Sequence, residues 1–253
     1  MRPGITQMFR DAAAFWHADR DLLLRIAGVF YLLPSLAMSL FLPNLVFTAA
    51  PTASGLSEAQ QAAELAAQQA ELLAWFGNVW PWLMSGLAFQ LLGTTIVMTM
   101  ILSPDRPVLG DAIRRALVQW PNVVIGWLLA SIACTLGLFA FILPGFYLAG
   151  RTYLTSAAIV AEKLGPVGGL FRGVQLSKGH GWLLTSAYLA ILLLQMFAAQ
   201  VLGGALAAVP SGSVFFSGLI FLLASMVSAA ASLASTLVQI AAYRTLSAPR
   251  QGM

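Results

Sequence analysis

Arg151 is the residue of this sequence whose position most needs a chemical explanation. It lies within an apolar segment, residues 146–161, and a charge at the centre of a membrane span costs at least ~2.5 kcal/mol to insert. A guanidinium in such a place must find hydroxyls, amides, carbonyls, water or a lipid phosphate. The chemistry that Arg151 offers is therefore the binding of an anion or of a lipid headgroup.

The candidate site around Arg151 draws on polar residues of several apolar segments. Glu162 is eleven residues further along, so on a helix it returns to nearly the same face but roughly 16 Å away, too far for contact. We predict an anion or headgroup site from the following residues: Arg151, Glu162, Arg172, Lys178, Gln90 and Gln239. An arginine that snorkels outward, or that ties its helix to neighbouring helices, is an equally good interpretation.

The residues that enzymes need are sparse. The two histidines, His17 and His180, are far apart in the chain, and no His, Cys and Glu residues have the spacing of metal ligands. The apolar segments contain no pair of carboxylates for acid/base catalysis, and no serine or cysteine beside a plausible base. We therefore expect no enzymatic activity and no cofactor or metal.

Composition indicates an integral membrane protein. Of the 253 residues, 59% are hydrophobic and only 9% are charged, against about a quarter in ordinary soluble domains. The net charge of +4 comes from basic residues scattered beside apolar segments, so it does not indicate a nucleic-acid partner. The single cysteine, Cys134, excludes an intramolecular disulfide.

Six apolar segments predict an all-α polytopic membrane protein with six transmembrane helices. Each is near the ~20 residues that a ~30 Å hydrocarbon core requires. The segments are residues 26–47, 79–102, 123–143, 146–161, 182–206 and 214–242. Pro34 and Pro43 should kink the first of them.

Helical periodicity also predicts helices outside the spans. Three amphipathic interfacial helices are expected on the cytoplasmic side, at residues 5–16, 103–120 and 166–178, with Asp111 paired to Arg115 in the second. One outer-side helix should begin at a capping box of Ser57 and Gln60, although an Ala/Gln-rich solvated spacer fits that loop as well.

The distribution of positive charge predicts the orientation. All of the 13 Lys and Arg residues except Arg151 fall on the side of the N-terminus, and the charged residues of the opposite loops are all glutamates. By the positive-inside rule, both termini are cytoplasmic and the protein is a multi-pass resident of the cytoplasmic (inner) membrane. We treat residues 1–253 as a single integral membrane domain, with an architectural repeat of three units: 1–103, 104–164 and 165–253.

Residues 143–180 carry a resemblance to a known family. The matching residues are Pro144, Gly145, Arg151, Glu162, Gly165, Pro166, Leu170, Arg172, Leu176, Lys178 and Gly179. This set resembles the six-span membrane domain associated with some bacterial glycerophosphoryl diester phosphodiesterases, and the similar stand-alone, uncharacterised inner-membrane proteins. Gly173 stands where that family usually has serine, and no phosphodiesterase domain is attached, so the resemblance implies a membrane module without the hydrolytic activity.

The function expected from the sequence is that of a non-catalytic module. Its basic amphipathic helices would bind or organise membrane lipids or partner membrane proteins at the anionic inner surface. The alternative is a transporter or permease subunit for an anionic or lipid-like substrate, suggested by prolines within spans. An intramembrane lipid enzyme is the third possibility.

The predicted orientation can be tested with reporter tags. A tag inserted after Glu64 should be accessible only from outside the cytoplasmic membrane, and a tag at Met253 only from inside. Accessibility of both tags from the same compartment would contradict the orientation.

Overall fold

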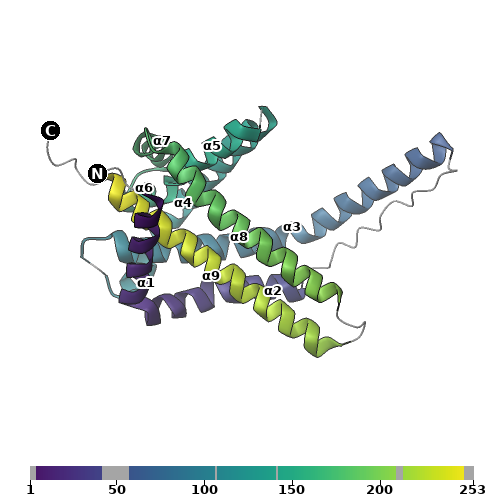
Figure 1. The fold of residues 1–253 in the computed structure, drawn as a ribbon, viewed down its shortest axis with the longest axis horizontal. Helices are drawn as coiled ribbons and strands as arrows, with labels where there is room; N and C mark the ends of the chain where they lie inside the picture. Colours follow the sequence, from purple (N-terminus) through teal and green to yellow (C-terminus); the bar gives the residue numbers. More distant parts are fainter. Residues whose placement is uncertain (1–3, 42–56, 106, 141, 209–212, 248–253) are drawn as a thin grey trace.

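The computed structural model describes residues 4–41, 57–105, 107–140, 142–208 and 213–247, in which all regular structure is helical (Figure 1). Five helical stretches of these residues are long and apolar enough to cross a membrane: Ile5–Leu40, Ala62–Leu102, Leu109–Phe139, Gly181–Ala207 and Phe215–Ser247. The all-α fold is thereby confirmed for the described residues, and the five long apolar helices indicate a multi-pass membrane protein. Several sequence predictions lie outside the described residues, namely those for Arg2, Arg106 and Arg250 and for residues 42–47 of the first predicted span, which include Pro43.

The first amphipathic segment and the first span are joined. Helix α1 (Ile5–Ala27) bends at Asp19, where φ is −130° and ψ is 29°, and then continues through a π-helical turn, η1 (Gly28–Leu32), into α2 (Leu33–Phe41). Pro34 has no backbone N–H to donate to the preceding turn, which explains why the regular α-helical hydrogen bonding is interrupted there by a π-helical turn. Because α1 bends at Asp19, its first half runs across the direction of α2 at one end of the bundle (Figure 1).

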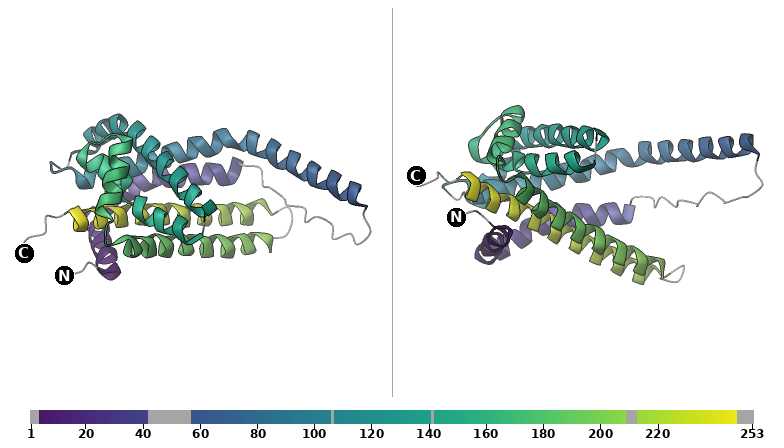
Figure 2. Two further views of the ribbon diagram at one scale, coloured as in Figure 1. Left: turned by 90° about the horizontal axis from the view of Figure 1, so that it is seen from above. Right: turned by 45° about the horizontal axis from the view of Figure 1, so that its top comes forward.

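The helix predicted after Ser57 and the second predicted span are also continuous, as α3 (Glu58–Leu102). The predicted capping box is present, because the Ser57 N–H donates to Gln60 Oε1 at 3.0 Å and the Gln60 N–H donates to Ser57 Oγ at 3.4 Å. The boundary expected near residue 79 is absent, and Pro81 lies within the helix. The first part of α3 projects away from the other helices (Figure 2).

The second amphipathic segment runs into the third span as α4 (Leu109–Ala140), through Pro121. The predicted pair of Asp111 and Arg115 is wrong. Arg115 Nη1 instead donates to Asp105 Oδ2 at 2.7 Å, because the loop before α4 brings that carboxylate closer. This hydrogen bond lowers the pKa of the Asp105 carboxyl.

The fourth apolar segment is divided. Helix α5 (Ile142–Thr152) and helix α6 (Thr155–Glu162) are separated by Tyr153 and Leu154, and Leu154 has the non-helical angles φ −90° and ψ 2°. Each helix is shorter than a membrane span, so this segment is not among the five long helices. The chain turns at Lys163, whose φ of 52° is left-handed, and begins α7 (Pro166–Leu176) at a proline suited to a first helical turn.

Two long helices complete the bundle, α8 (Gly181–Ala207) and α9 (Val214–Ser247). Helix α9 packs against α1, α2, α3 and α8, and its buried Leu237 and Ile240 join the core formed by Ile96 of α3 and Ile159 of α6. The start of α1, the end of α9, and α6 and α7 all lie at the same end of the molecule (Figure 1). The three-unit repeat stays a prediction.

The contact of α5 with α8 depends on Gly150. A Cβ at this position would lie 2.6 Å from the backbone nitrogen of Thr185 and 2.7 Å from its Cα, so the two backbones meet there. We expect Gly150→Leu to lower the free energy of unfolding by about 1–3 kcal/mol or more through overpacking. Denaturant unfolding of the purified protein in detergent measures this loss.

Gly203→Leu is the matched control, because a Cβ at Gly203 of α8 meets nothing within 4 Å. It should change the same free energy by less than about 0.5 kcal/mol. Equal losses in the two variants would contradict a close contact of α5 and α8.

Candidate functional site

Arg151 is held by α7. From the last turn of α5, its Nη2 donates to the Val174 carbonyl at 2.9 Å and its Nε donates to Ser177 Oγ at 3.3 Å. Its guanidinium carbon also lies 5.8 Å from the ring centroid of Tyr147. The carbonyls of a helix C-terminus carry partial negative charge, so α7 supplies the compensation that a cation in this segment needs.

Glu162 lies at the junction of three helices. Arg172 of α7 donates from Nε to both carboxylate oxygens, at 2.8 and 3.0 Å, and the Tyr243 hydroxyl of α9 donates to Oε1 at 3.0 Å. Hydrogen bonding to this carboxylate raises the pKa of the Arg172 guanidinium. Glu162 therefore compensates Arg172 and fastens α6 to α7 and α9.

The remaining predicted site residues lie elsewhere. Gln90 of α3 donates from Nε2 to Ser232 Oγ of α9 at 2.6 Å, Gln239 faces a cavity described below, and Lys178 is exposed. Within the described residues, the hydrogen bonds of Arg151 go to α7, and none joins it to Gln90 or Gln239. The structure thus brings Glu162 and Arg172 together, and leaves the two glutamines apart from the arginine.

Serines of α9 hydrogen-bond across its helix contacts. Ser225 Oγ lies 3.4 Å from Ser39 Oγ of α2, Ser232 accepts from Gln90, and the Tyr153 hydroxyl donates to the Ser235 carbonyl at 3.1 Å. Tyr31 of η1 adds a hydroxyl that lies 3.0 Å from Thr94 Oγ1 and 3.2 Å from Thr236 Oγ1. This seam holds helices together, as small hydroxyl residues do in membranes.

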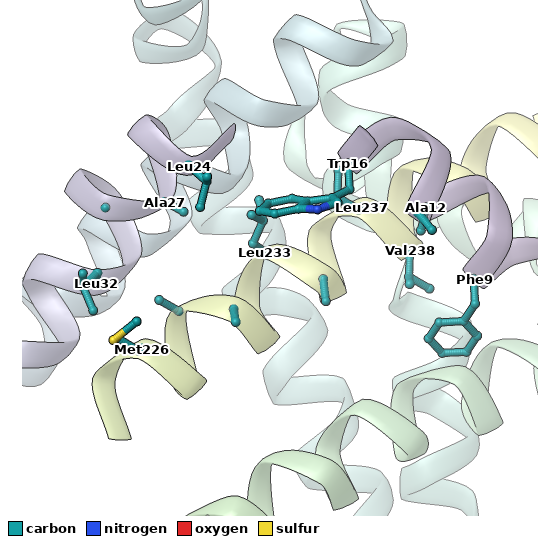
Figure 3. Close-up of a pocket in the computed structure, with 15 residues that line it drawn as sticks. Phe9, Ala12, Trp16, Leu24, Ala27, Leu32, Met226, Leu233, Leu237 and Val238 are labelled. Atoms are coloured by element: carbon teal, nitrogen blue, oxygen red, sulfur yellow. The ribbon is translucent and has the colours of Figure 1, made fainter. Parts of the chain in front are cut away.

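An apolar groove of about 530 Å³ lies between α1 with η1 and α9. Figure 3 shows Trp16 reaching from α1 toward Leu233 and Leu237 of α9, with Leu32 and Met226 further along the groove. All the residues that line it are apolar apart from the indole nitrogen of Trp16. Ala230 and Ala234 are exposed to it, and their small side chains give it room.

A smaller hollow of about 310 Å³ lies beside the loop that precedes α4. Arg115 and Lys163 contribute cations to its wall, and Asp105 and Gln119 contribute acceptors. Since Asp105 already accepts a hydrogen bond from Arg115, the positive charge of Lys163 is in excess there. Anionic groups are the ligands that such a wall attracts.

A third cavity, of about 390 Å³, lies among α4, α5, α6, α8 and α9. Hydroxyl, thiol and amide groups line it together with apolar side chains, and Gln239 is one of them. Neither this cavity nor the α1–α9 groove is predicted from the sequence. The alanines of α9 were a signal for the groove, but the break in the fourth segment, on which the cavity depends, has no proline or glycine at residues 153 and 154 to predict it.

Across the described ranges, no group of three or more His, Cys, Asp or Glu residues is arranged to hold a metal ion.

No protein-family model, no curated protein and no solved structure matches this chain. The groove, the cavities and the charged residues are therefore the features that indicate a function.

The two interpretations of Arg151 predict different results. If Arg151 mainly fastens α7, Arg151→Met should lower the free energy of unfolding by about 1–3 kcal/mol, since hydrogen bonds from charged donors are lost. The amides of residues 166–177 should then exchange with deuterium faster than in the original protein. Mass spectrometry of the exchanged peptides measures this.

Arg20→Met is the control, because Arg20 is exposed and makes a 3.6 Å surface ion pair with Asp21. It should leave exchange in α7 unchanged. If Arg151→Met also leaves that exchange unchanged but removes a bound anion, Arg151 is an anion ligand and not a fastening for α7.

Proposed function

We propose that this chain is a non-catalytic integral membrane module that binds lipid and organises lipids or partner proteins in the cytoplasmic membrane. The α1–α9 groove is the observation that carries this proposal. It lies where the first half of α1 crosses the end of the bundle, and its wall offers almost only apolar contacts. The occupant that suits it is the acyl chain of a phospholipid, since a chain gains dispersion contacts along such a wall without needing polar partners.

Charge at the same helix favours an anionic lipid. Arg10 and Arg25 of α1 are exposed, close in sequence to the groove residues Phe9 and Leu24. Each cation near an anionic membrane surface contributes about 1 kcal/mol of attraction. The hollow beside Arg115 and Lys163 adds positive charge for a second headgroup.

The orientation and the sixth crossing belong to the same proposal. Helices α5 and α6 span residues 142–162, and 21 residues at ~1.5 Å each cover about 30 Å, so together they complete a return across the bilayer. Six crossings would leave both termini on the cytoplasmic side, together with the basic helix α7. The first half of α1, the first turns of α4, and α7 would be the interfacial helices, and the relationship to the phosphodiesterase-associated membrane domain is proposed on the same residues as before.

A transporter or permease subunit is the second candidate. The break between α5 and α6 beside a polar cavity favours it, because transporters often bind substrate where a membrane helix is interrupted. Among the described residues that line this cavity there is no cation, so it supports a lipid-like substrate better than an anionic one.

The groove can be tested by filling it. Ala230→Leu combined with Ala234→Leu should place side chains in the groove and reduce the phospholipid that stays bound after a delipidating detergent wash by about tenfold, the ratio for ~1.4 kcal/mol of lost binding. Native mass spectrometry counts the bound lipids.

Arg10→Gln with Arg25→Gln should keep the number of bound lipids and reduce the preference for anionic over zwitterionic lipid.

Ala199→Leu is the matched control, since Ala199 is an exposed alanine of α8 outside the groove. It should retain as much lipid as the original protein. Equal retention by the filled-groove variant would refute the proposed function.

A further inference from the structure

Trp16 divides the α1–α9 groove into a longer and a shorter part. It comes three residues before the bend of α1, and Figure 3 shows its ring reaching across the groove toward Leu233 of α9. On α9, the longer part extends from Leu233 back to Met226, seven residues or about 10 Å of helix. The residues that line this part, on α1 and η1 as well as on α9, are all apolar. Trp16 thus places a polar nitrogen at one end of an apolar channel.

The indole N–H of Trp16 has no partner in the protein. No acceptor among the described residues bonds to it, whereas Trp120 Nε1 donates to the Ala88 carbonyl at 3.1 Å. The nitrogen is accessible as well, since the three side-chain atoms of the described ranges that are both fully buried and unpartnered belong to glutamine and threonine residues. Tryptophans that are largely buried usually find a partner for this group. A ligand in the groove can therefore reach an unused donor.

An indole N–H restricts the chemistry of its partner. It can only donate, so the ligand must bring an acceptor. An uncharged acceptor suits the place, because no other described residue that lines the groove has a polar side chain to solvate an ion. The carbonyl oxygen of an ester meets both conditions, and it is attached directly to an acyl chain. An ether oxygen at the same position is a weaker acceptor.

The surroundings of Trp16 suit the polar part of the same lipid. Residues 17–21, which form the bend, are all exposed, and so are the cations Arg10 and Arg25 of the same helix. Trp16 therefore lies between an apolar groove and a polar surface. A glycerophospholipid has the same order of groups, because its ester lies between an apolar chain and a charged headgroup.

We propose that Trp16 binds the ester carbonyl of a glycerophospholipid, with its Nε1–H donating to the carbonyl oxygen and the acyl chain lying in the longer part of the groove. This inference rests on the proposed function, because it requires that the groove holds an acyl chain. It adds the chemical class of the lipid, which is an ester-linked chain in preference to an ether-linked one.

Two lipids with the same headgroup test the hydrogen bond. The full chain, purified and delipidated in detergent, is titrated with dipalmitoyl phosphatidylglycerol and separately with its dihexadecyl ether analogue. Native mass spectrometry gives the lipid concentration at which half of the protein carries lipid. The ester lipid should reach this point at about fivefold lower concentration, the ratio expected for one hydrogen bond between neutral groups.

Trp16→Phe keeps an aromatic ring in the groove and removes the N–H. It should bring the two concentrations together, because neither lipid then has a donor to bond with. The ratio of the two concentrations is the measured quantity, so a loss of apolar contact that weakens both lipids equally does not imitate this result. Where Trp16→Phe does not fold, replacement of Trp16 by benzothienylalanine, in which sulfur takes the place of the N–H, gives the same comparison in a ring of nearly the same shape.

Trp182→Phe is the matched control, since Trp182 is 66% exposed on α8 and does not line the groove. It should keep the fivefold preference for the ester lipid. The same titration with Ala230→Leu combined with Ala234→Leu should weaken the ester and the ether lipid alike, because these variants obstruct the chain.

Three results would overturn the ester contact while leaving the lipid groove in place. These are equal binding of the ester and ether lipids by the original protein, an ester preference that survives in Trp16→Phe, and binding of palmitic acid that is tighter than that of the ester lipid and is lost in Trp16→Phe. The last result would assign the N–H to a carboxylate. Undiminished binding of both lipids by Ala230→Leu with Ala234→Leu would instead refute the groove, and the ester contact with it.

Discussion

The structure depends on one constraint, that polar groups buried among apolar helices need hydrogen-bond partners within the protein. Arg151 obeys it by donating to the last turn of α7, and Gln90 and Tyr31 obey it by bonding to hydroxyls of α9. These bonds draw α7 onto α5 and hold η1 and α3 against α9. The arrangement of the helices therefore follows from where polar residues interrupt the apolar segments as much as from the apolar segments themselves.

Long-range features of the sequence predicted the fold better than local ones. Five of the six apolar segments form long helices, because a run of some twenty apolar residues admits few other structures in a bilayer. Helix ends were harder to place: Pro81 and Pro121 lie inside α3 and α4, since a proline in a membrane helix can be accommodated by its neighbours. The break at Tyr153 and Leu154 has no local sequence signal, and arises where α6 packs against α3, α4 and α7.

The candidate site could be predicted only in part, for a related reason. Arg151 and Glu162 were identified as residues that need partners, because burial of charge is costly whatever the fold. Their partners, Val174, Ser177, Arg172 and Tyr243, come from α7 and α9 and depend on how these helices meet. The pairing of Arg115 with Asp105 and not with Asp111 shows the same limit, since a loop can outcompete helical spacing.

The continuity of α3 has a mechanical consequence. A helix of 45 residues at ~1.5 Å per residue is about 68 Å long, more than twice the thickness of a hydrocarbon core of ~30 Å. Its membrane-embedded part and its projecting part form a single lever, so a tilt of about 5° at the Leu102 end displaces the far tip by roughly 6 Å. Slight reorientations of the helices packed around the Leu102 end are thus magnified into larger displacements at the projecting end of α3.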